Sequence, residues 1–143
     1  MWEYAVVGAA GVLIGVLADR LIVVLNKKRK EDYEQTLIKA FGNPIYLNEL
    51  GLDDVYEWAN ARKDKLAGGS KVVIMRANAK QLRDYVADLP DSGSANSLML
   101  MALIDCSGEK PCIAESILIK FANLEQALES ELEKGNGALV VEG

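Results

Sequence analysis

The sequence predicts an α+β protein: one N-terminal transmembrane helix continuing into a cytosolic helix, followed by a ferredoxin-like (β-α-β-β-α-β) two-layer domain. Three observations predict this organisation: a long apolar run near the N-terminus, a cluster of cations directly behind it, and alternating strand-like and helix-like patterns after residue 70. We expect a transmembrane anchor with its basic cluster over residues 1–30, a helical connector over residues 31–70, and the ferredoxin-like domain over residues 71–143.

The apolar run covers residues 4–25 and is 22 residues long. As a helix rising ~1.5 Å per residue it would reach about 33 Å, enough for a hydrocarbon core of roughly 30 Å. The basic cluster Lys27, Lys28, Arg29 and Lys30 follows it, and the positive-inside rule assigns such a cluster to the cytoplasm. We therefore expect an inner-membrane protein with its N-terminus outside and its C-terminal domain in the cytoplasm. A cleaved signal peptide fits less well, because no base precedes the run and no small-x-small cleavage site follows it.

Glycines recur on one side of the expected span, at Gly8, Gly11 and Gly15, and residues 11–15 form a GxxxG pattern. In lipid, close approach of backbones across small residues is a main source of helix association. The stripe therefore predicts packing between transmembrane helices and a homo-oligomer. The alternative stays open, because small residues are also common in spans that do not associate.

Asp19 and Arg20 are ionisable residues inside the expected span. At the centre of a membrane helix such a residue costs on the order of 2.5–3.5 kcal/mol on insertion scales, and it costs less near the end. Asp19 continues the glycine stripe, which would turn it toward other subunits or a water-filled pore, where carboxylates favour cations. The alternatives are a pair between Asp19 and Arg20 near the headgroups, or a shorter span that ends at Ala18.

The charge of the chain is divided between its two parts. Residues 1–30 carry five bases and two acids, whereas the whole chain has a net charge of −5, so residues 31–143 carry −8. Phosphate backbones repel an acidic domain, so nucleic-acid binding is disfavoured. It is not excluded, because Arg62, Lys63 and Lys65, with Lys71 nearby, could form a local basic pocket. The cations of residues 27–30 instead match anionic lipid headgroups.

Apolar residues at helical spacing predict helices over residues 31–41 and 52–66. Farther along, strand-like runs occupy residues 71–77, 98–105, 114–122 and 138–142, with capped helices expected from Asn78 to Leu89 and after Asn123. This order is that of a split βαβ unit. We expect a four-stranded, mainly antiparallel sheet with two helices on one face, and the helix around Trp58 is a candidate to cover the other.

The chemistry of the chain argues against an enzyme. There is no histidine, which removes the usual general base, the commonest metal ligand and every Ser-His or Cys-His pair. Walker A, GxGxxG and GxSxG motifs are also absent from the sequence. Cys106 and Cys112 flank the expected hairpin turn; they would be reduced in the cytosol and alone make an incomplete zinc site. We expect no catalysis, no cofactor and no metal.

A polar loop over residues 91–97 is the best candidate contact site for a ligand or partner. Its hydroxyl, amide and carboxylate groups, at Asp91, Ser92, Ser94 and Asn96, are of types common in binding loops. The alternative is an ordinary connector between two elements.

Two functions agree with these patterns. The first is a self-associating pore-forming or ion-channel effector, gated by its cytosolic ligand- or partner-sensing domain; in architecture it resembles compact effectors of bacterial antiviral defence. The second is a membrane-tethered adaptor or scaffold that does not conduct ions. The position of Asp19 on the glycine stripe favours the first.

Overall fold

The structure is a computed structural model that describes residues 5–8, 11–27, 33–77, 79, 97–135 and 137–142. In this part of the chain it is a mixed α+β fold with a six-stranded sheet in the order β1-β6-β3-β4-β5-β2. The strands are β1 (Ala5–Gly8), β2 (Ile45–Leu50), β3 (Lys71–Arg76), β4 (Leu98–Asp105), β5 (Cys112–Leu124) and β6 (Ala138–Glu142). The helices are α1 (Gly11–Lys27), α2 (Tyr33–Phe41), α3 (Leu52–Asn60), α4 (Lys63–Ala67) and α6 (Gln126–Lys134).

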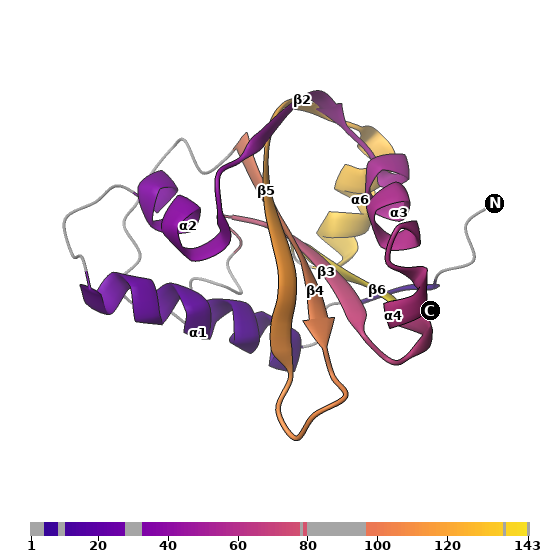
Figure 1. Cartoon of the computed structure of the whole chain (residues 1–143). Helices are drawn as coiled ribbons and strands as arrows, with labels where there is room; N and C mark the ends of the chain where they lie inside the picture. Colours follow the sequence, from indigo (N-terminus) through magenta and orange to yellow (C-terminus); the bar gives the residue numbers. More distant parts are fainter. Residues whose placement is uncertain are drawn as a thin grey trace.

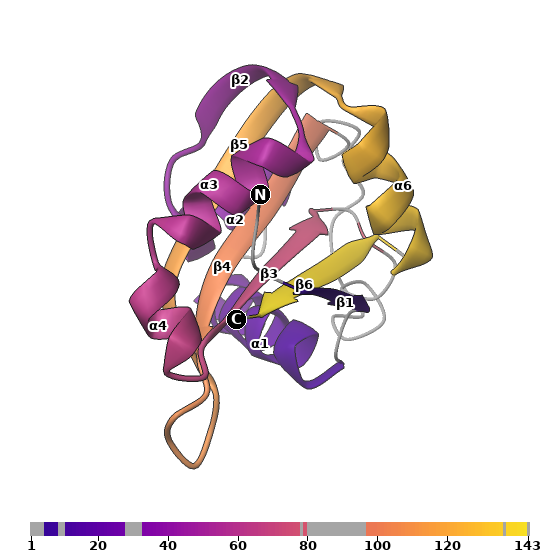
Figure 2. The same cartoon turned by 90° about the vertical axis from the view of Figure 1, so that its right-hand side faces the viewer.

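The fold has three layers, where the sequence predicts two. Helices α1 and α2 cover one face of the sheet, and α3, α4 and α6 cover the other (Figures 1 and 2). The helix around Trp58, α3, therefore shares its face with α6. Each face has its own apolar cluster. The cluster under α1 and α2 includes Leu17 and Leu37, and the cluster under α3, α4 and α6 includes Val55 and Leu132.

Strand β4 shows why the sheet needs cover on both faces. Its residues 98–104 are all buried and nearly continuously apolar, as expected of a strand with no solvated side. Because alternate side chains of a strand point to opposite faces, Leu100 packs beneath α1 and α2 while Met101 packs beneath the other helices. Strand β3 divides in the same way, with Met75 on the first face and Ile74 on the second.

The ferredoxin-like strand order is not confirmed. The four strands expected from the sequence correspond to β3, β4, β5 and β6, and they lie in the order β6-β3-β4-β5. This is the fourth-first-second-third order of a Greek key, in which β3 pairs directly and antiparallel with β4. A ferredoxin-like sheet would place β5 beside β3 instead. The helix expected between Asn78 and Leu89 lies outside the described residues, apart from Ala79.

Two further strands extend this sheet at its edges. Strand β1 pairs antiparallel with β6, and β2 pairs parallel with β5. The sequence pattern misses both strands: β1 is hidden inside the apolar run of residues 4–25, and β2 is only six residues long, with a mixed pattern of exposure.

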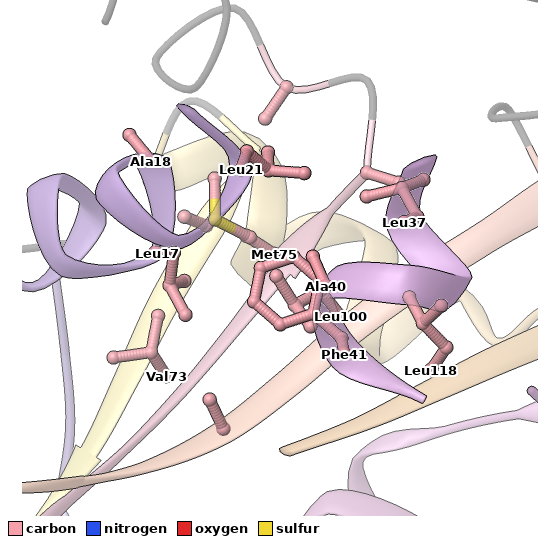
Figure 3. Packing of buried hydrophobic residues seen from close by; sticks show 14 of the residues in the cluster. Leu17, Ala18, Leu21, Leu37, Ala40, Phe41, Val73, Met75, Leu100 and Leu118 are labelled. Carbon is pink, nitrogen blue, oxygen red and sulfur yellow. The ribbon is translucent and has the colours of Figure 1, made fainter. Parts of the chain in front are cut away.

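The apolar run of residues 4–25 is divided between β1 and α1 and does not form a single helix. On α1, Leu13, Leu17 and Leu21 recur every four residues and are buried. Figure 3 shows Leu17 and Leu21 directed toward Val73 and Met75 of the central strand. Helix α1 thus lies along the sheet as part of the core.

Within the described residues, no helix combines the length and the apolar character that a crossing of the membrane requires. The predicted spanning helix over residues 4–25 is therefore not found. The physical reason is that Val6 and Val7 supply β-branched residues that suit a strand beside β6, and that the leucine stripe of α1 fits the sheet. Helix α1 ends at Lys27 and α2 begins at Tyr33, with the residues between them outside the described part.

Candidate functional site

The glycines of the predicted packing stripe do not lie on one helix. Gly8 is the last residue of β1, Gly11 is the first residue of α1, and Gly15 lies one turn farther on and is half-buried. Asp19 and Arg20 are both exposed on α1. The guanidinium of Arg20 donates a hydrogen bond from Nη1 to the Ala40 carbonyl oxygen at 3.2 Å, which ties α1 to α2.

The other predicted site residues lie at or beyond the limits of the described part. Lys27 ends α1, whereas Lys28, Arg29 and Lys30 are outside the described residues. The loop residues Asp91, Ser92, Ser94 and Asn96 are also outside them. Ser97, the final residue of that loop, is described and lies directly before β4.

A cleft of about 410 Å³ lies beside the edge strand β2. It is formed where β2 and β5 run side by side near the start of β4. Its lining consists of Tyr46, Leu47, Asn48, Ser97, Lys120, Phe121 and Ala122. The cleft therefore connects the edge of the sheet with the end of the polar loop that the sequence marks as a contact site.

An exposed aromatic ring and a cation stand together in this cleft. Tyr46 is 72% exposed and its neighbour Ile45 is 45% exposed, so two large side chains with apolar surface lie in succession on the edge strand. Tyr46 and Lys120 are register partners on β2 and β5. The Lys120 ammonium lies 5.9 Å from the centroid of the Tyr46 ring, within reach of a cation–π attraction. The cleft thus offers an apolar surface with one positive charge.

The outer side of β2, away from β5, is an edge of the sheet that the described residues form. The strand is the last in the sheet order, so in the part of the chain that the structure describes no strand pairs with its outer side. The Glu125 amide donates to the Leu50 carbonyl at 2.8 Å, so the groups of Leu50 face β5. Because backbone groups alternate in direction along a strand, those of Leu47 and Glu49 point outward.

The basic pocket proposed around Arg62 is largely neutralised by acids. Arg62 donates to Glu115 from Nε at 2.8 Å and from Nη2 at 3.2 Å, and from Nη1 to the Trp58 carbonyl at 2.9 Å. Its guanidinium also stacks 3.6 Å from the Trp58 ring centroid. A second cleft of about 300 Å³ there is lined by two bases and two acids: Arg62 and Lys65 with Asp64 and Glu115, beside Ala61.

The electrostatics of Glu115 follow from this contact. The Arg62 hydrogen bond, aided by the charges of Arg62 and Lys65, lowers the pKa of Glu115 from its ordinary value, although desolvation opposes the shift. The Glu115 carboxylate is therefore ionised and bound to Arg62 at neutral pH. An arginine bound in this way ties the turn between α3 and α4 to β5 and is poorly placed to bind phosphate.

The two cysteines are free thiols at the base of the β4–β5 hairpin. Cys106 is half-buried and Cys112 is exposed. Among the described residues, no group of three or more His, Cys, Asp or Glu side chains is placed to hold a metal ion.

Comparisons with known proteins give no relative from which to assign a family. No protein-family model matches the chain, no curated protein matches it significantly, and no solved structure does so either. The assignment of the cleft beside β2 as a candidate site therefore rests on its geometry alone. A sequence signal for it was present in the apolar triplet of residues 45–47, placed after Pro44 and before the polar pair Asn48 and Glu49.

Proposed function

We propose that this protein is a membrane-associated adaptor or scaffold without catalytic activity, which holds a partner-binding domain at the bilayer surface. The observation that carries the proposal is the surplus of apolar residues on α1. The sheet buries the stripe of Leu13, Leu17 and Leu21, with Ala18 beside it. A helix that packs on a sheet by one face normally carries polar residues elsewhere.

The sequence of α1 offers few residues for such a polar face. Val12 and Val23 share the helical spacing of the exposed Asp19, whereas Val16 packs against the core, and only Asp19 and Arg20 are charged before Lys27. A helix that is apolar beyond its core stripe suits the boundary between headgroups and acyl chains. The basic cluster of residues 27–30 adds attraction to anionic lipids, worth about 1 kcal/mol per charge.

Attachment along the membrane plane agrees with the position of α1 on the sheet. Leu13, Leu17, Ala18 and Leu21 remain in the core, with Val16 and Ile22 packed against them. Apolar residues elsewhere in the sequence of the helix would supply the contact with the membrane. The domain and its N-terminus would then lie on the same, cytoplasmic side of the membrane.

A pore-forming or channel effector is the second candidate, and the observation that favours it is the exposed Asp19 in a helix whose only other charged residues are Arg20 and Lys27. That function requires α1 to leave the sheet and span the bilayer. Departure would uncover the face formed by Val73, Met75 and Leu100, which are fully buried. The adaptor needs no such rearrangement, and for that reason we prefer it.

Vesicle flotation of the full chain tests membrane association. The double variant Lys27→Gln/Lys28→Gln should bind vesicles containing phosphatidylglycerol about 30-fold more weakly, because two charges at about 1 kcal/mol each are lost. The matched control Lys63→Gln/Lys110→Gln removes two exposed lysines from the other part of the chain and should bind as the unaltered chain does. Absence of flotation, or equal loss in both variants, would overturn the proposal.

Release of a trapped dye from the same vesicles separates the two candidates. The adaptor should bind without releasing dye. A pore should release it, and Asp19→Ala or Gly15→Leu should then abolish the release. Dye release by the unaltered chain that both substitutions suppress would replace the adaptor with the effector.

A further inference from the structure

We infer that the outer edge of β2 binds an extended basic peptide of a partner protein by strand addition. This inference rests on the proposed adaptor function and specifies the class of partner that the adaptor would recognise. The peptide would lie antiparallel to β2 as a further strand beside the six of the described sheet, because antiparallel pairing is slightly more stable per residue than parallel pairing.

The first support is the direction of the β2 backbone. The Leu50 carbonyl accepts the Glu125 amide at 2.8 Å, so the backbone groups of Leu50 face β5. Those of Leu47 and Glu49 therefore point outward, to the edge of the described sheet. An open edge is a template for another strand. Main-chain hydrogen bonds would supply affinity, and alternate side chains would supply specificity.

The second support is the apolar surface on the first half of β2. Ile45 and Tyr46 are the two large apolar side chains that are exposed in the described part of the chain, at 45% and 72%. Because they are consecutive in a strand, they lie on opposite faces of it. Leu47 is half-buried on the same face as Ile45. An added strand would cover both faces at once, which a ligand docked on one face would not do.

The third support is the acidic character of the second half of β2. Glu49 is exposed, and its register partner on β5 is the uncharged Asn123. Just beyond the strand, Asp54 accepts the Gly51 amide at 2.9 Å, and the Glu125 carboxylate lies against Gly51, where an added Cβ would collide with it. Opposite charges that face each other on neighbouring strands stabilise the pairing. The peptide position that faces Glu49 therefore favours a base.

The charge of the domain favours the same class of partner. Residues 31–143 carry −8, since residues 1–30 carry +3 and the whole chain carries −5. This charge attracts a basic partner and repels an acidic one.

The position of Lys120 decides where the peptide carries its base. Lys120 is the register partner of Tyr46 and has a further interaction besides its contact with that ring. It lies on the other face of the strand from Glu49 and about 10 Å farther back, since each residue adds ~3.3 Å. The favoured peptide therefore carries an apolar residue opposite Tyr46 and a base opposite Glu49.

A second copy of this chain does not meet the requirement. Strand β2 contains no base, so in a pairing of two β2 strands none would face Glu49. The net charge of −5 on each copy also opposes their approach. Charge complementarity selects a basic strand from another protein.

The test uses the full chain and two labelled heptapeptides, which alternate valine with lysine or valine with glutamate. Fluorescence polarisation should show binding of the lysine peptide and weaker binding of the glutamate peptide. Glu49→Lys turns an attraction into a repulsion, so it should weaken binding of the lysine peptide about tenfold. It should also strengthen binding of the glutamate peptide, a gain that an unfolded variant would not give.

The matched control is Glu109→Lys, an equal charge change in the exposed hairpin turn. It should leave the preference between the two peptides unchanged, which separates the contact at Glu49 from the general attraction of an acidic domain for cations. If both variants changed the preference equally, or if the unaltered chain did not prefer the lysine peptide, the inference would be overturned.

Backbone methylation of the lysine peptide tests strand addition without altering the protein. In an antiparallel pairing, the residue that faces Glu49 exchanges both backbone hydrogen bonds with it. The amides of the lysines therefore face β2, and those of the valines face away. N-methyl groups on the lysine amides should abolish binding, and N-methyl groups on the valine amides should preserve it. Equal losses from the two patterns, or a loss from valine methylation alone, would overturn the proposed pairing.

The outcome is independent of membrane binding. Glu49 lies on β2, outside α1 and the basic cluster of residues 27–30. Loss of flotation with intact peptide binding would therefore remove the membrane proposal alone. Intact flotation with no peptide binding would remove only the present inference.

Discussion

The two faces of the sheet are covered by helices of very different character. On one face, α6 buries Leu128 and Leu132 and is otherwise polar or charged except for Ala127. On the other, α1 buries its leucine stripe but has only Asp19 and Arg20 as charged residues before Lys27. Helix α6 has the apolar residues that a sheet requires and few more. Helix α1 is more apolar in sequence, with Val16 and Ile22 packed against the core beside its leucine stripe. The membrane association that we propose would give its remaining apolar residues a second environment.

The largest expected effect compares one core leucine from each face. Leu17→Ala and Leu132→Ala should each lower the free energy of unfolding by about 2–5 kcal/mol, because both side chains are fully buried and each substitution leaves a cavity. Urea unfolding of the full chain measures both. If only Leu132→Ala destabilised the protein, α1 would not be part of the folded core in solution.

A smaller effect is expected at two glycines with positive φ, one after a helix on each face. Gly42 follows α2 with φ +103 and open space around it, so Gly42→Ala should cost about 1 kcal/mol from backbone strain alone. Gly137 follows α6 with φ +98, and an added Cβ would lie 3.3 Å from the Ala79 Cβ. Gly137→Ala should therefore cost more, about 1–2 kcal/mol. Thermal unfolding measures the loss of stability in each variant. Equal losses would show that the close approach to the Ala79 Cβ adds no cost at Gly137.

The smallest effect concerns the arginine contacts of the two faces. Arg62→Ala should cost roughly 0.2–1 kcal/mol, because the Glu115 side chain is 40% exposed and solvent screens the pair. Arg20→Ala removes one hydrogen bond to the Ala40 carbonyl and should cost no more than that. Urea unfolding at pH 7 measures both, and a larger loss for Arg20→Ala would reverse the comparison.

The pH dependence of the Arg62 contact has a definite sign. Binding of Arg62 lowers the pKa of Glu115 in the folded protein. The resulting stability is present above the ordinary glutamate pKa, about 4.3, and is lost as the pH falls through the lowered folded value. The difference between the unaltered chain and Arg62→Ala should therefore shrink below about pH 4. If the difference in unfolding free energy between the two proteins persisted unchanged at pH 2, the stabilisation would come from the stacking of Arg62 on Trp58 instead.

The central strands could be predicted from local pattern, and the edges could not. Residues 98–105 and 138–142 match β4 and β6 in both bounds, because continuous apolar runs between polar turns leave few alternatives. Strand β1 was missed because a strand and a helix in succession give the same unbroken apolar run as a membrane span. Only pairing with β6 distinguishes them, and that contact is distant in sequence.

The candidate site was predictable only in part. Ser97, the last residue of the predicted polar loop, lines the cleft, whereas Asp91, Ser92, Ser94 and Asn96 lie outside the described residues, so the loop stays a prediction. Tyr46 and Lys120 were not predicted, because their proximity depends on a parallel pairing between strands more than 60 residues apart. Local spacing carries no information about such a pairing. The ferredoxin-like strand order was not confirmed, for the same reason. The pattern βαββαβ describes succession along the chain and does not fix which strands are neighbours.

The pairing of β1 with β6 has a consequence for synthesis on the ribosome. The partner of Ala5 is Glu142, so the first strand waits for about 130 further residues before its neighbour exists. At roughly 5–20 residues per second, that delay is on the order of 6–26 s. Throughout this interval β1 has no neighbouring strand with which to pair, whereas α1 can already pack on β3, β4 and β5 once these strands have been made.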